Sequence, residues 1–350
     1  MRPSDTRILQ RTGLRLGVLG LGCAPLGNLY QRNSDADADA TVLAAWDAGV
    51  RFFDTAPLYG HGLSEHRLGR VLRERPRDEF VLSTKVGRLL RPRGAAAGER
   101  QAHWIDPLPF EPAFDYTAAG VRRSLEDSLQ RLGLAHVDIA LVHDIGRATH
   151  GERHAHHWQQ LTAGGGLHEL ERLRDEGLIG AIGLGVNEWA VIADVLEHTN
   201  LDCALLAGRY TLLDQSALEP FLDLALRRQV GVVIGGPFNS GVLATGASAQ
   251  ATFDYGAVPQ AIIERVQRLQ RVCASFQVPL AAAALQFPLA HPAVVSCVPG
   301  VRHPTELQQV VEWLNVPLPT ALWATLLEQG LLPPGTPVPA ALPMHGQAAR

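Results

Sequence analysis

Short apolar runs alternate with amphipathic segments along most of the chain. The runs are apolar at successive positions, which is typical of parallel strands buried on both faces. Counting from Gly17, the pattern predicts eight strands alternating with helices. The predicted strands cover residues 17–22, 51–54, 80–85, 137–143, 181–184, 203–207, 230–234 and 294–298. The predicted helices cover residues 35–48, 64–73, 117–132, 167–176, 189–197, 217–228, 259–275, 281–287 and 305–314.

Parallel strand–helix units repeated eight times imply a closed (β/α)8 barrel of the TIM type. An open, doubly wound sheet is the alternative, and it would normally place a glycine fingerprint after its first strand. Gly17–Gly22 carries GLG, but no further glycine follows at the required spacing and the next residues do not open a helix. We therefore predict one barrel domain over 1–350, with its active site at the carboxyl ends of the strands.

Several segments fall outside the repeat. Residues 7–16 predict a small hairpin ahead of the barrel. The connections 86–115, 144–165 and 237–258 follow the third, fourth and seventh strands, and their length predicts functional loops that overhang the mouth. Residues 318–350 are rich in Pro and Ala, so we expect a partly irregular tail that packs loosely or frays.

Composition and charge narrow the possible functions. Of the 350 residues 46% are apolar and the net charge is −4, which indicates a soluble globular protein with no basic stripe for nucleic acid. No run approaches the ~18 apolar residues of a membrane span, and the N-terminus has no apolar signal core. The four cysteines lie far apart without a CxxC pair, which predicts buried free thiols and a cytoplasmic, reducing location. The oligomeric state stays open.

Polar side chains stand at the ends of three predicted strands. Asp54, Lys85 and His143 each end one of them, and Tyr59 follows Asp54 by five residues in the turn DTAPLYG. Because the carboxyl ends of the strands open at the same mouth of a barrel, we expect these four side chains to meet there. Any one of them alone could have a structural role, as a turn cap, a loop aromatic or a solvated charge.

Together the four residues have the chemistry of a proton-transfer site. A free tyrosine has a pKa near ~10, and a neighbouring lysine ammonium favours the phenolate. We therefore expect Lys85 to bring the pKa of Tyr59 nearer to neutrality, with Asp54 holding Lys85 and His143 donating to a substrate oxygen. A hydride must come from or go to a cofactor, because no side chain supplies one.

Two interpretations of other classes stay open. The first is a catalytically silent barrel that only binds a cofactor, which the complete set of four residues disfavours. The second is a metal-dependent barrel hydrolase, which would need His and carboxylate ligands at several strand ends. Only Asp54 and His143 meet that requirement.

The motif DTAPLYG, the strand ending in Lys85 and LVHD around His143 resemble the aldo-keto reductases, and the resemblance extends over residues 14–314. It implies a (β/α)8 barrel that binds an extended nicotinamide cofactor without a Rossmann motif. It further implies that Asp54, Tyr59, Lys85 and His143 are the catalytic tetrad. In that tetrad Tyr59 is the acid/base, Lys85 modulates its pKa, Asp54 holds Lys85, and His143 orients the carbonyl or hydroxyl.

The same resemblance implies cofactor contacts at the ends of the later strands, with departures from the family pattern. The family typically has a Ser-Asn pair that grips the carboxamide, where this chain has Gly185 and Val186 ahead of Asn187. It often has an aromatic residue against the nicotinamide ring, where this chain has Gly235–Gly236. The candidate cofactor-binding residues are Asn187, Gly236, Pro237, Phe238, Ser240, Gly241, Pro299, Gly300, Arg302, Glu306 and Gln309.

The resemblance also bears on cofactor and substrate. NADP-preferring members often have an arginine where this chain has Glu306, and a carboxylate there repels a 2′-phosphate, so of NAD and NADP we expect NAD. GLIGAIGLGVNEW and LLAGRYTLLDQ are most similar to the branch that oxidises D-threo-aldoses, L-fucose or galactose. That similarity implies oxidation of the anomeric C1 hydroxyl of an aldose to a lactone, with Tyr59 as the base. A pyridoxal 4-dehydrogenase and a general aldehyde or ketone reductase are the alternatives.

Two further clusters lie in the long connections. One could suggest a metal site, but it has no cysteine, so we expect a solvated rim loop and no metal; it comprises His150, His154, His156 and His157. The other could line a substrate entrance or form a solvated flap; it comprises Arg91, Arg93, Arg100, His103 and Trp104.

Overall fold

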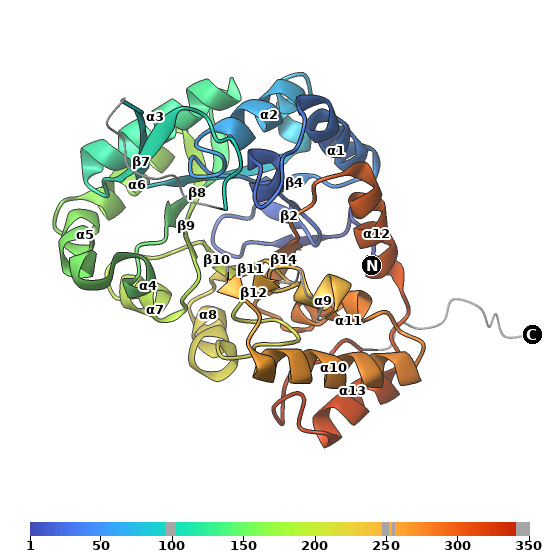
Figure 1. The fold of residues 1–350 in the computed structure, drawn as a ribbon. Coiled ribbons are helices and arrows are strands. Elements are labelled where there is room, and N and C mark those ends of the chain that lie inside the picture. The colour runs from blue at the N-terminus through green and yellow to red at the C-terminus, as the bar shows by residue number, and fades with distance from the viewer. Residues whose placement is uncertain (95–102, 247–251, 254–255, 341–350) are drawn as a thin grey trace, which may run out of the picture.

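In the computed structural model, which describes residues 1–94, 103–246, 252–253 and 256–340, eight parallel strands form one sheet at the centre (Figure 1). In sheet order they are β3 (Leu21–Gly22), β4 (Phe52–Asp54), β5 (Val81–Val86), β8 (Val137–His143), β9 (Ile179–Val186), β10 (Cys203–Ala207), β11 (Gly231–Gly235) and β14 (Val294–Val298). Parallel bridges from Leu19 to Cys297 and from Gly22 to Gly300 join the first strand segment to the last. The predicted (β/α)8 barrel is confirmed.

Helices surround this sheet (Figure 1). They are α1 (Asp35–Asp47), α2 (Leu63–Leu72), α3 (Ala118–Leu132), α6 (Gly166–Asp175), α7 (Ala190–Leu196), α8 (Asp223–Arg227), α10 (Gln260–Ser275), α11 (Leu280–Gln286) and α12 (Pro304–Asn315). A π-helical turn, Leu218–Leu222, precedes α8. The side chain of Thr117 caps α3 by accepting from the Gly120 amide, as expected for a threonine at a helix start. Because α12 packs against α1, the ring of helices closes.

The barrel has an inner and an outer core. Side chains that point inward form a cluster with Phe52, Leu141 and Leu205 at its centre, and the opposite faces of the strands pack against the helices. The predicted N-terminal hairpin is present as β1 (Thr6–Ile8) and β2 (Arg15–Gly17). Leu16 in β2 and Leu9, which directly follows β1, join the inner cluster. The hairpin therefore packs into the amino-terminal end of the barrel, which leaves the carboxyl ends of the strands for a site.

The three long connections contain more regular structure than the sequence predicts. The first forms the antiparallel hairpin β6 (Arg88–Pro92) and β7 (Phe110–Phe114). The second forms α4 (Arg147–His150), the 3₁₀ turn Gly151–Arg153 and α5 (His154–Leu161). The described part of the third forms α9 (Val242–Thr245), β12 (Thr252–Phe253) and β13 (Gly256–Ala257). The sequence predicts these segments only as loops, because their helices and strands depend on tertiary packing and not on a local apolar pattern.

The C-terminal segment also contains a helix, α13 (Thr320–Glu328), which packs against α10. Trp323 and Leu326 on this helix are fully buried, so the prediction of loose packing is wrong for this part of the tail. Residues 341–350, which the same prediction covered, lie outside the described residues. Among the described residues, no single helix is long and apolar enough to span a bilayer, although two strongly bent helix pairs reach that length and composition jointly.

Candidate active site

The structure brings the four predicted tetrad side chains together at the mouth of the barrel. Lys85 Nζ donates to both carboxylate oxygens of Asp54, at 2.9 and 2.8 Å, and to the carbonyl oxygen of Thr55 at 2.9 Å. The same ammonium lies 4.8 Å from the centre of the Tyr59 ring. The His143 ring stands edge-on to Tyr59, with 6.1 Å between the ring centres.

The turn after β4 fixes Tyr59 through a very close backbone approach. Gly60 has φ +62°, and a Cβ at this position would lie 2.5 Å from the carbonyl oxygen of Gly27. A Cβ at Gly27 would in turn lie 2.5 Å from the backbone of Tyr59. Only glycines fit on both sides of this contact. The glycine that ends DTAPLYG is therefore a packing requirement for the position of Tyr59.

The Lys85 side chain is only 1% exposed, so its charge depends on the balance between burial and its ion pair with Asp54. Burial disfavours the ammonium, but the neighbouring Asp54 carboxylate and Tyr59 outweigh it, so the pKa of Lys85 is raised. Ser83 also donates to Asp54, at 2.7 Å. The chain therefore holds a charged lysine directly beside the phenol of Tyr59.

Tyr59 itself behaves differently from the sequence prediction. Burial raises the pKa of Tyr59 to about 12, and this effect exceeds the opposing influence of the Lys85 ammonium. Asp54 and Asp144 raise the pKa of Tyr59 further. The expectation that the pKa of Tyr59 lies nearer to neutrality is therefore wrong, although Lys85 does act in the predicted direction. At neutral pH Tyr59 is a phenol.

His143 is neutral at the end of β8. Burial lowers its pKa well below the usual range, and the cations Arg88 and Lys85 lower it further. Its carbonyl oxygen accepts from the Tyr116 hydroxyl at 2.7 Å, which fixes the backbone at this point. A neutral imidazole has one N–H to donate, so His143 can hydrogen bond a substrate oxygen without adding a charge.

The sequence prediction missed an ion pair beside His143. Arg88 Nη2 donates to Asp144 Oδ2, and both side chains are largely buried. Asp144 stands within the motif LVHD, and Arg88 follows Lys85 by three residues, so both were visible in the sequence as neighbours of tetrad residues. Nothing in the spacing alone showed that the hairpin β6/β7 would bring them into contact.

Of the cluster in the first long connection, Trp104 belongs to the site. Its ring lies 5.7 Å from the Tyr59 ring at an angle of 34°, and the side chain is buried. His103 packs beside it at 5.4 Å. Arg93 instead pairs with Glu111 at 3.4 Å. Arg91 is exposed, and Arg100 lies outside the described residues.

The turn after β11, which is predicted to bind the cofactor, contains small residues with a left-handed backbone conformation. Gly236 has φ +56°, and a Cβ there would meet no atom within 4 Å, so the chain leaves space at this point. Ser240 and Gly241 also have positive φ, 58° and 97°. These features fit a ligand that approaches the backbone closely. Pro237 stands in the same turn, directly after Gly236.

Two residues predicted in this region already contact the protein itself. The Phe238 ring packs edge-on against Trp313, with ring centres 5.6 Å apart, and is buried. Its side chain therefore belongs to the core. The carbonyl oxygen of Asn187 accepts from Arg209 Nε at 3.0 Å, which orients the backbone at the end of β9.

The predicted residues after β14 are held tightly by the protein. Pro299 accepts from the Gly22 amide at 2.9 Å, and Gly300 forms a bridge to the same residue, so both close the barrel. The backbone amide of Arg302 donates to Glu306 Oε2 at 2.7 Å. Gln309 is exposed on α12. These contacts fix the course of the loop between β14 and α12.

Three of the four clustered histidines are buried, so the expectation of a solvated loop is wrong for them, whereas His156 is exposed as expected. His150, His154 and His157 are each at most 7% exposed, because α4 and α5 pack them against the protein. His150 Nε2 lies 3.0 Å from the Tyr116 hydroxyl, and burial lowers the pKa of His150 to about 4. No group of three or more His, Cys, Asp or Glu within the described residues is arranged to hold a metal ion.

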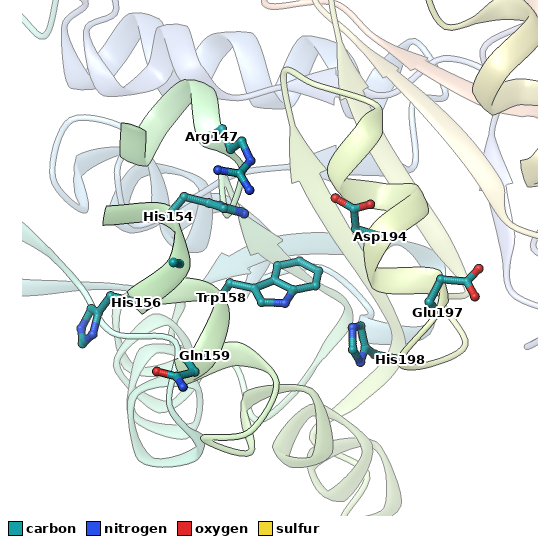
Figure 2. Close-up of a pocket in the computed structure, with 9 residues that line it drawn as sticks. Arg147, His154, His156, Trp158, Gln159, Asp194, Glu197 and His198 are labelled. Atoms are coloured by element: carbon teal, nitrogen blue, oxygen red, sulfur yellow. The ribbon is translucent and has the colours of Figure 1, made fainter. Parts of the chain in front are cut away.

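A groove of about 740 Å³ lies between α5 and α7. Figure 2 shows Trp158 in its centre, with Asp194 and Glu197 on one side and Arg147 and His154 on the other. None of the four tetrad residues lines this groove. The candidate active site is therefore defined by the tetrad at the mouth and is distinct from this hollow.

Comparisons with known proteins agree with this arrangement. The model of the Aldo/keto reductase family matches residues 18–328. A pyridoxal 4-dehydrogenase of Microbacterium luteolum is 49% identical over 95% of this chain and 99% of its own. A D-threo-aldose 1-dehydrogenase of a Pseudomonas species is 40% identical over 92% of this chain and 96% of its own.

Solved structures agree at the level of the fold. An aldo-keto reductase from Bacillus halodurans in its holo form has a TM-score of 0.72, with 98% of this chain and 99% of that chain covered and 23% identity. The family match extends over most of the chain and the tetrad motifs lie within it. The chain therefore belongs to the aldo/keto reductase family.

Proposed function

We propose that this protein oxidises the hydroxyl of a cyclic hemiacetal to a lactone and passes the hydride to NAD. Family membership makes it an NAD(P)-dependent oxidoreductase. The observation that carries the proposal is the contact of a buried, charged Lys85 with Tyr59, beside a neutral His143. This arrangement supplies a proton carrier, a charge that stabilises its phenolate and a donor for the substrate oxygen.

The first candidate substrate is an aldose, oxidised at C1. A relative at 40% identity is named for this activity on D-threo-aldoses. The second candidate is pyridoxal, because a relative at 49% identity is named a pyridoxal 4-dehydrogenase. An aldose and pyridoxal share one chemical feature: each has an aldehyde that a hydroxyl of the same molecule closes into a cyclic hemiacetal. A single reaction therefore covers both candidates.

In the proposed reaction the hemiacetal C–H bond breaks and its electron pair leaves as hydride, while the O–H proton moves to Tyr59. A carbon–oxygen double bond forms, and the ring becomes a lactone. Bound NAD supplies the hydride acceptor. Lys85 stabilises the Tyr59 phenolate, Asp54 keeps Lys85 charged and oriented, and His143 holds the substrate oxygen. Asn187 and the turn from Gly236 to Gly241 would hold the cofactor.

A buried aromatic ring lies directly beside the proposed proton carrier. The Trp104 ring is tilted by 34° against the Tyr59 ring, with 5.7 Å between the ring centres. The apolar face of a sugar ring or the face of a pyridine ring can pack on an aromatic ring. Trp104 is therefore compatible with both candidate substrates.

The preference for NAD rests on the first turn of α12. Glu306 places a carboxylate there and accepts from the Arg302 amide, and Arg302 Nη1 lies 3.7 Å from the same carboxylate. A 2′-phosphate at this position would be repelled by Glu306 and would compete for Arg302. The ribose 2′-hydroxyl of NAD is uncharged, so Glu306 would not repel it and it would not compete for Arg302.

The proposed location is the cytoplasm. All four cysteines are buried free thiols, as the sequence predicts. This agrees with a reducing compartment, in which disulfides do not form.

A substrate panel tests the proposal. Aldoses, pyridoxal and simple aldehydes are each offered with NAD and with NADP, while reduced nicotinamide is followed by absorbance and the product is identified by mass spectrometry. We expect a lactone from an aldose or from pyridoxal, with NAD preferred, and no loss of activity in EDTA. Reduction of simple aldehydes without lactone formation would contradict the proposed substrate class. Absence of turnover with either cofactor would favour a catalytically silent barrel.

A further inference from the structure

The ion pair of Arg88 and Asp144 lies directly beside His143. Arg88 Nη2 donates to Asp144 Oδ2, and the exposed fractions of the two side chains are 6% and 14%. The guanidinium also lies over the Phe114 ring, 4.8 Å from its centre. A charge pair this well buried is costly to form and does not by itself indicate a gain in stability. Because the pair lies next to His143, we ask what it does to the protonation of that side chain.

Asp144 faces one particular nitrogen of His143. Its Oδ2 atom lies 3.5 Å from His143 Nε2, whereas the buried His143 Nδ1 has no hydrogen-bond partner within the described part of the chain. A carboxylate beside a ring nitrogen favours a proton on that nitrogen and repels a lone pair there. The neutral ring therefore holds its single proton on Nε2. Nδ1 keeps the lone pair.

Arg88 moderates the effect of the Asp144 carboxylate on His143. Burial and the cations Arg88 and Lys85 lower the pKa of His143, so the ring is not protonated a second time. Because Asp144 is bonded to Arg88, its carboxylate biases the site of the proton on His143 without creating an imidazolium. Glu188 is the further acidic group near Asp144, and its own Oε1 accepts from the Ala148 amide at 2.8 Å.

We propose that Asp144, held by Arg88, is a positioning residue that keeps the His143 proton on Nε2, where it can be donated to the substrate oxygen. The inference rests on the role of His143 in the proposed function. The backbone supports it, because Asp144 has φ +48° and its amide donates to the Gly185 carbonyl at 2.9 Å. The Asp144 carboxylate is thus held in place before any substrate binds. This is expected of a group that positions a reactive side chain.

The substitution Asp144→Asn tests the positioning role. An amide can turn its N–H toward Nε2, which then becomes the acceptor, so the His143 proton moves to Nδ1. We expect kcat to fall on the order of 10²-fold, as when a donor is held in the wrong tautomer, with cofactor affinity unchanged. Arg88→Gln is the second variant, because it leaves Asp144 in place and removes its partner.

The other end of β8 offers a matched control. Asp138 also pairs with an arginine, Arg77, at 2.7 Å, and it accepts from the Leu82 amide at 2.7 Å. Asp138→Asn therefore makes the same chemical change on the same strand, far from the tetrad. We expect this control to lower the thermal stability and to leave kcat within about twofold of the original, because it removes only a partly buried pair.

The direct readout is the ¹⁵N NMR spectrum of histidine-labelled protein without cofactor, with the His143 signals identified by their loss in His143→Gln. We expect an Nε2–H ring in the unchanged protein and in Asp138→Asn, and an Nδ1–H ring in Asp144→Asn. A proton on Nδ1 in the unchanged protein, or an unaltered ring in Asp144→Asn, would overturn the proposal. Since this measurement needs no turnover, failure of the substrate panel would refute the proposed function and leave this inference standing.

Discussion

The two halves of the barrel mouth satisfy their polar groups in different ways. At the ends of β4, β5 and β8, charged side chains bond to one another, as in the contact of Lys85 with both oxygens of Asp54. At the ends of β9, β11 and β14, glycines and backbone groups prevail, and a Cβ at Gly236 would meet nothing within 4 Å. The first half is complete without a ligand, whereas the second leaves room for one.

The difference follows from the cost of burying charge. A buried ammonium or carboxylate without a partner is strongly unfavourable, so the tetrad half has to be fully paired in the folded chain. At the ends of β9 and β11 the cofactor half presents glycines and backbone groups, which carry no such requirement, and its charged pair, Arg302 with Glu306, lies in the loop and helix after β14. The proposed catalytic groups are therefore held in place by the protein itself, whereas the proposed cofactor contacts would be completed on binding. Each prediction below tests one side of this contrast.

The largest effect is expected from Lys85→Met. It removes the charge beside Tyr59 and leaves the Asp54 carboxylate, which is 3% exposed, without its main partner. We expect kcat to fall on the order of 10³-fold and the free energy of unfolding to fall by about 3–5 kcal/mol. Turnover and denaturant unfolding measure the two losses. Arg70→Met, which breaks the half-exposed pair with Asp39, is the control and should change little.

A second prediction concerns pH. Oxidation needs the Tyr59 phenolate, and burial raises the pKa of Tyr59 to about 12, so the active form grows as the pH rises toward that value. We expect kcat/KM for oxidation to increase by up to about tenfold per pH unit above neutrality, and reduction, which needs the phenol, to show no such rise. Rate profiles in both directions measure this. A flat oxidation profile would show that pairing with Lys85 outweighs burial.

The cofactor half is tested by exchanging Glu306. In Glu306→Arg the repulsion of a 2′-phosphate is replaced by attraction. We therefore expect the ratio of kcat/KM for NADP to kcat/KM for NAD to rise about tenfold. Glu306→Gln is the matched control, because it removes the charge and keeps an oxygen for the Arg302 amide. It should give a smaller shift in the same direction. A strong NADP preference of the unchanged protein would refute the assignment of Glu306.

The smallest effect is expected from a substitution at Gly185, where the end of β9 contacts Lys85 of the tetrad half. A Cβ at Gly185 would lie 3.1 Å from Lys85 Cε and 3.3 Å from Lys85 Cδ, so Gly185→Ala presses on the lysine stem from the cofactor side. Overpacking of this size costs about 1–3 kcal/mol when the neighbours cannot yield. We expect a several-fold lower kcat with unchanged KM for the cofactor. A changed cofactor KM with unchanged kcat would place Gly185 in the cofactor half instead.

The sequence predicted the tetrad half well for a physical reason. Strand ends can be located from apolar runs, and a barrel brings their carboxyl ends together, so Asp54, Lys85 and His143 could be placed without knowing any contact. The glycine after Tyr59 is explained only by the structure, which shows the Gly27 backbone 2.5 Å from where its Cβ would be.

The remaining features depend on packing between distant segments. The hairpin β6/β7 brings Arg88 to Asp144, across 56 positions of sequence, and no local pattern encodes that contact. The pKa of Tyr59 was predicted with the wrong sign because the sequence shows the charged neighbours and not the depth of burial. His150, His154 and His157 were mistaken for parts of a solvated loop for the same reason. The core position of Phe238 also became visible only through its contact with Trp313.

The central claim is that Tyr59 carries the proton of a hydride transfer. Tyr59→Phe removes one hydroxyl and keeps the ring against Trp104 and Lys85, so the fold and the cofactor half should be unaffected. The decisive measurement combines single-turnover hydride transfer with the dissociation constant for NADH from fluorescence titration. We predict a loss of the transfer rate on the order of 10³-fold or more, with NADH affinity unchanged. Hydride transfer at the original rate in Tyr59→Phe would contradict the account.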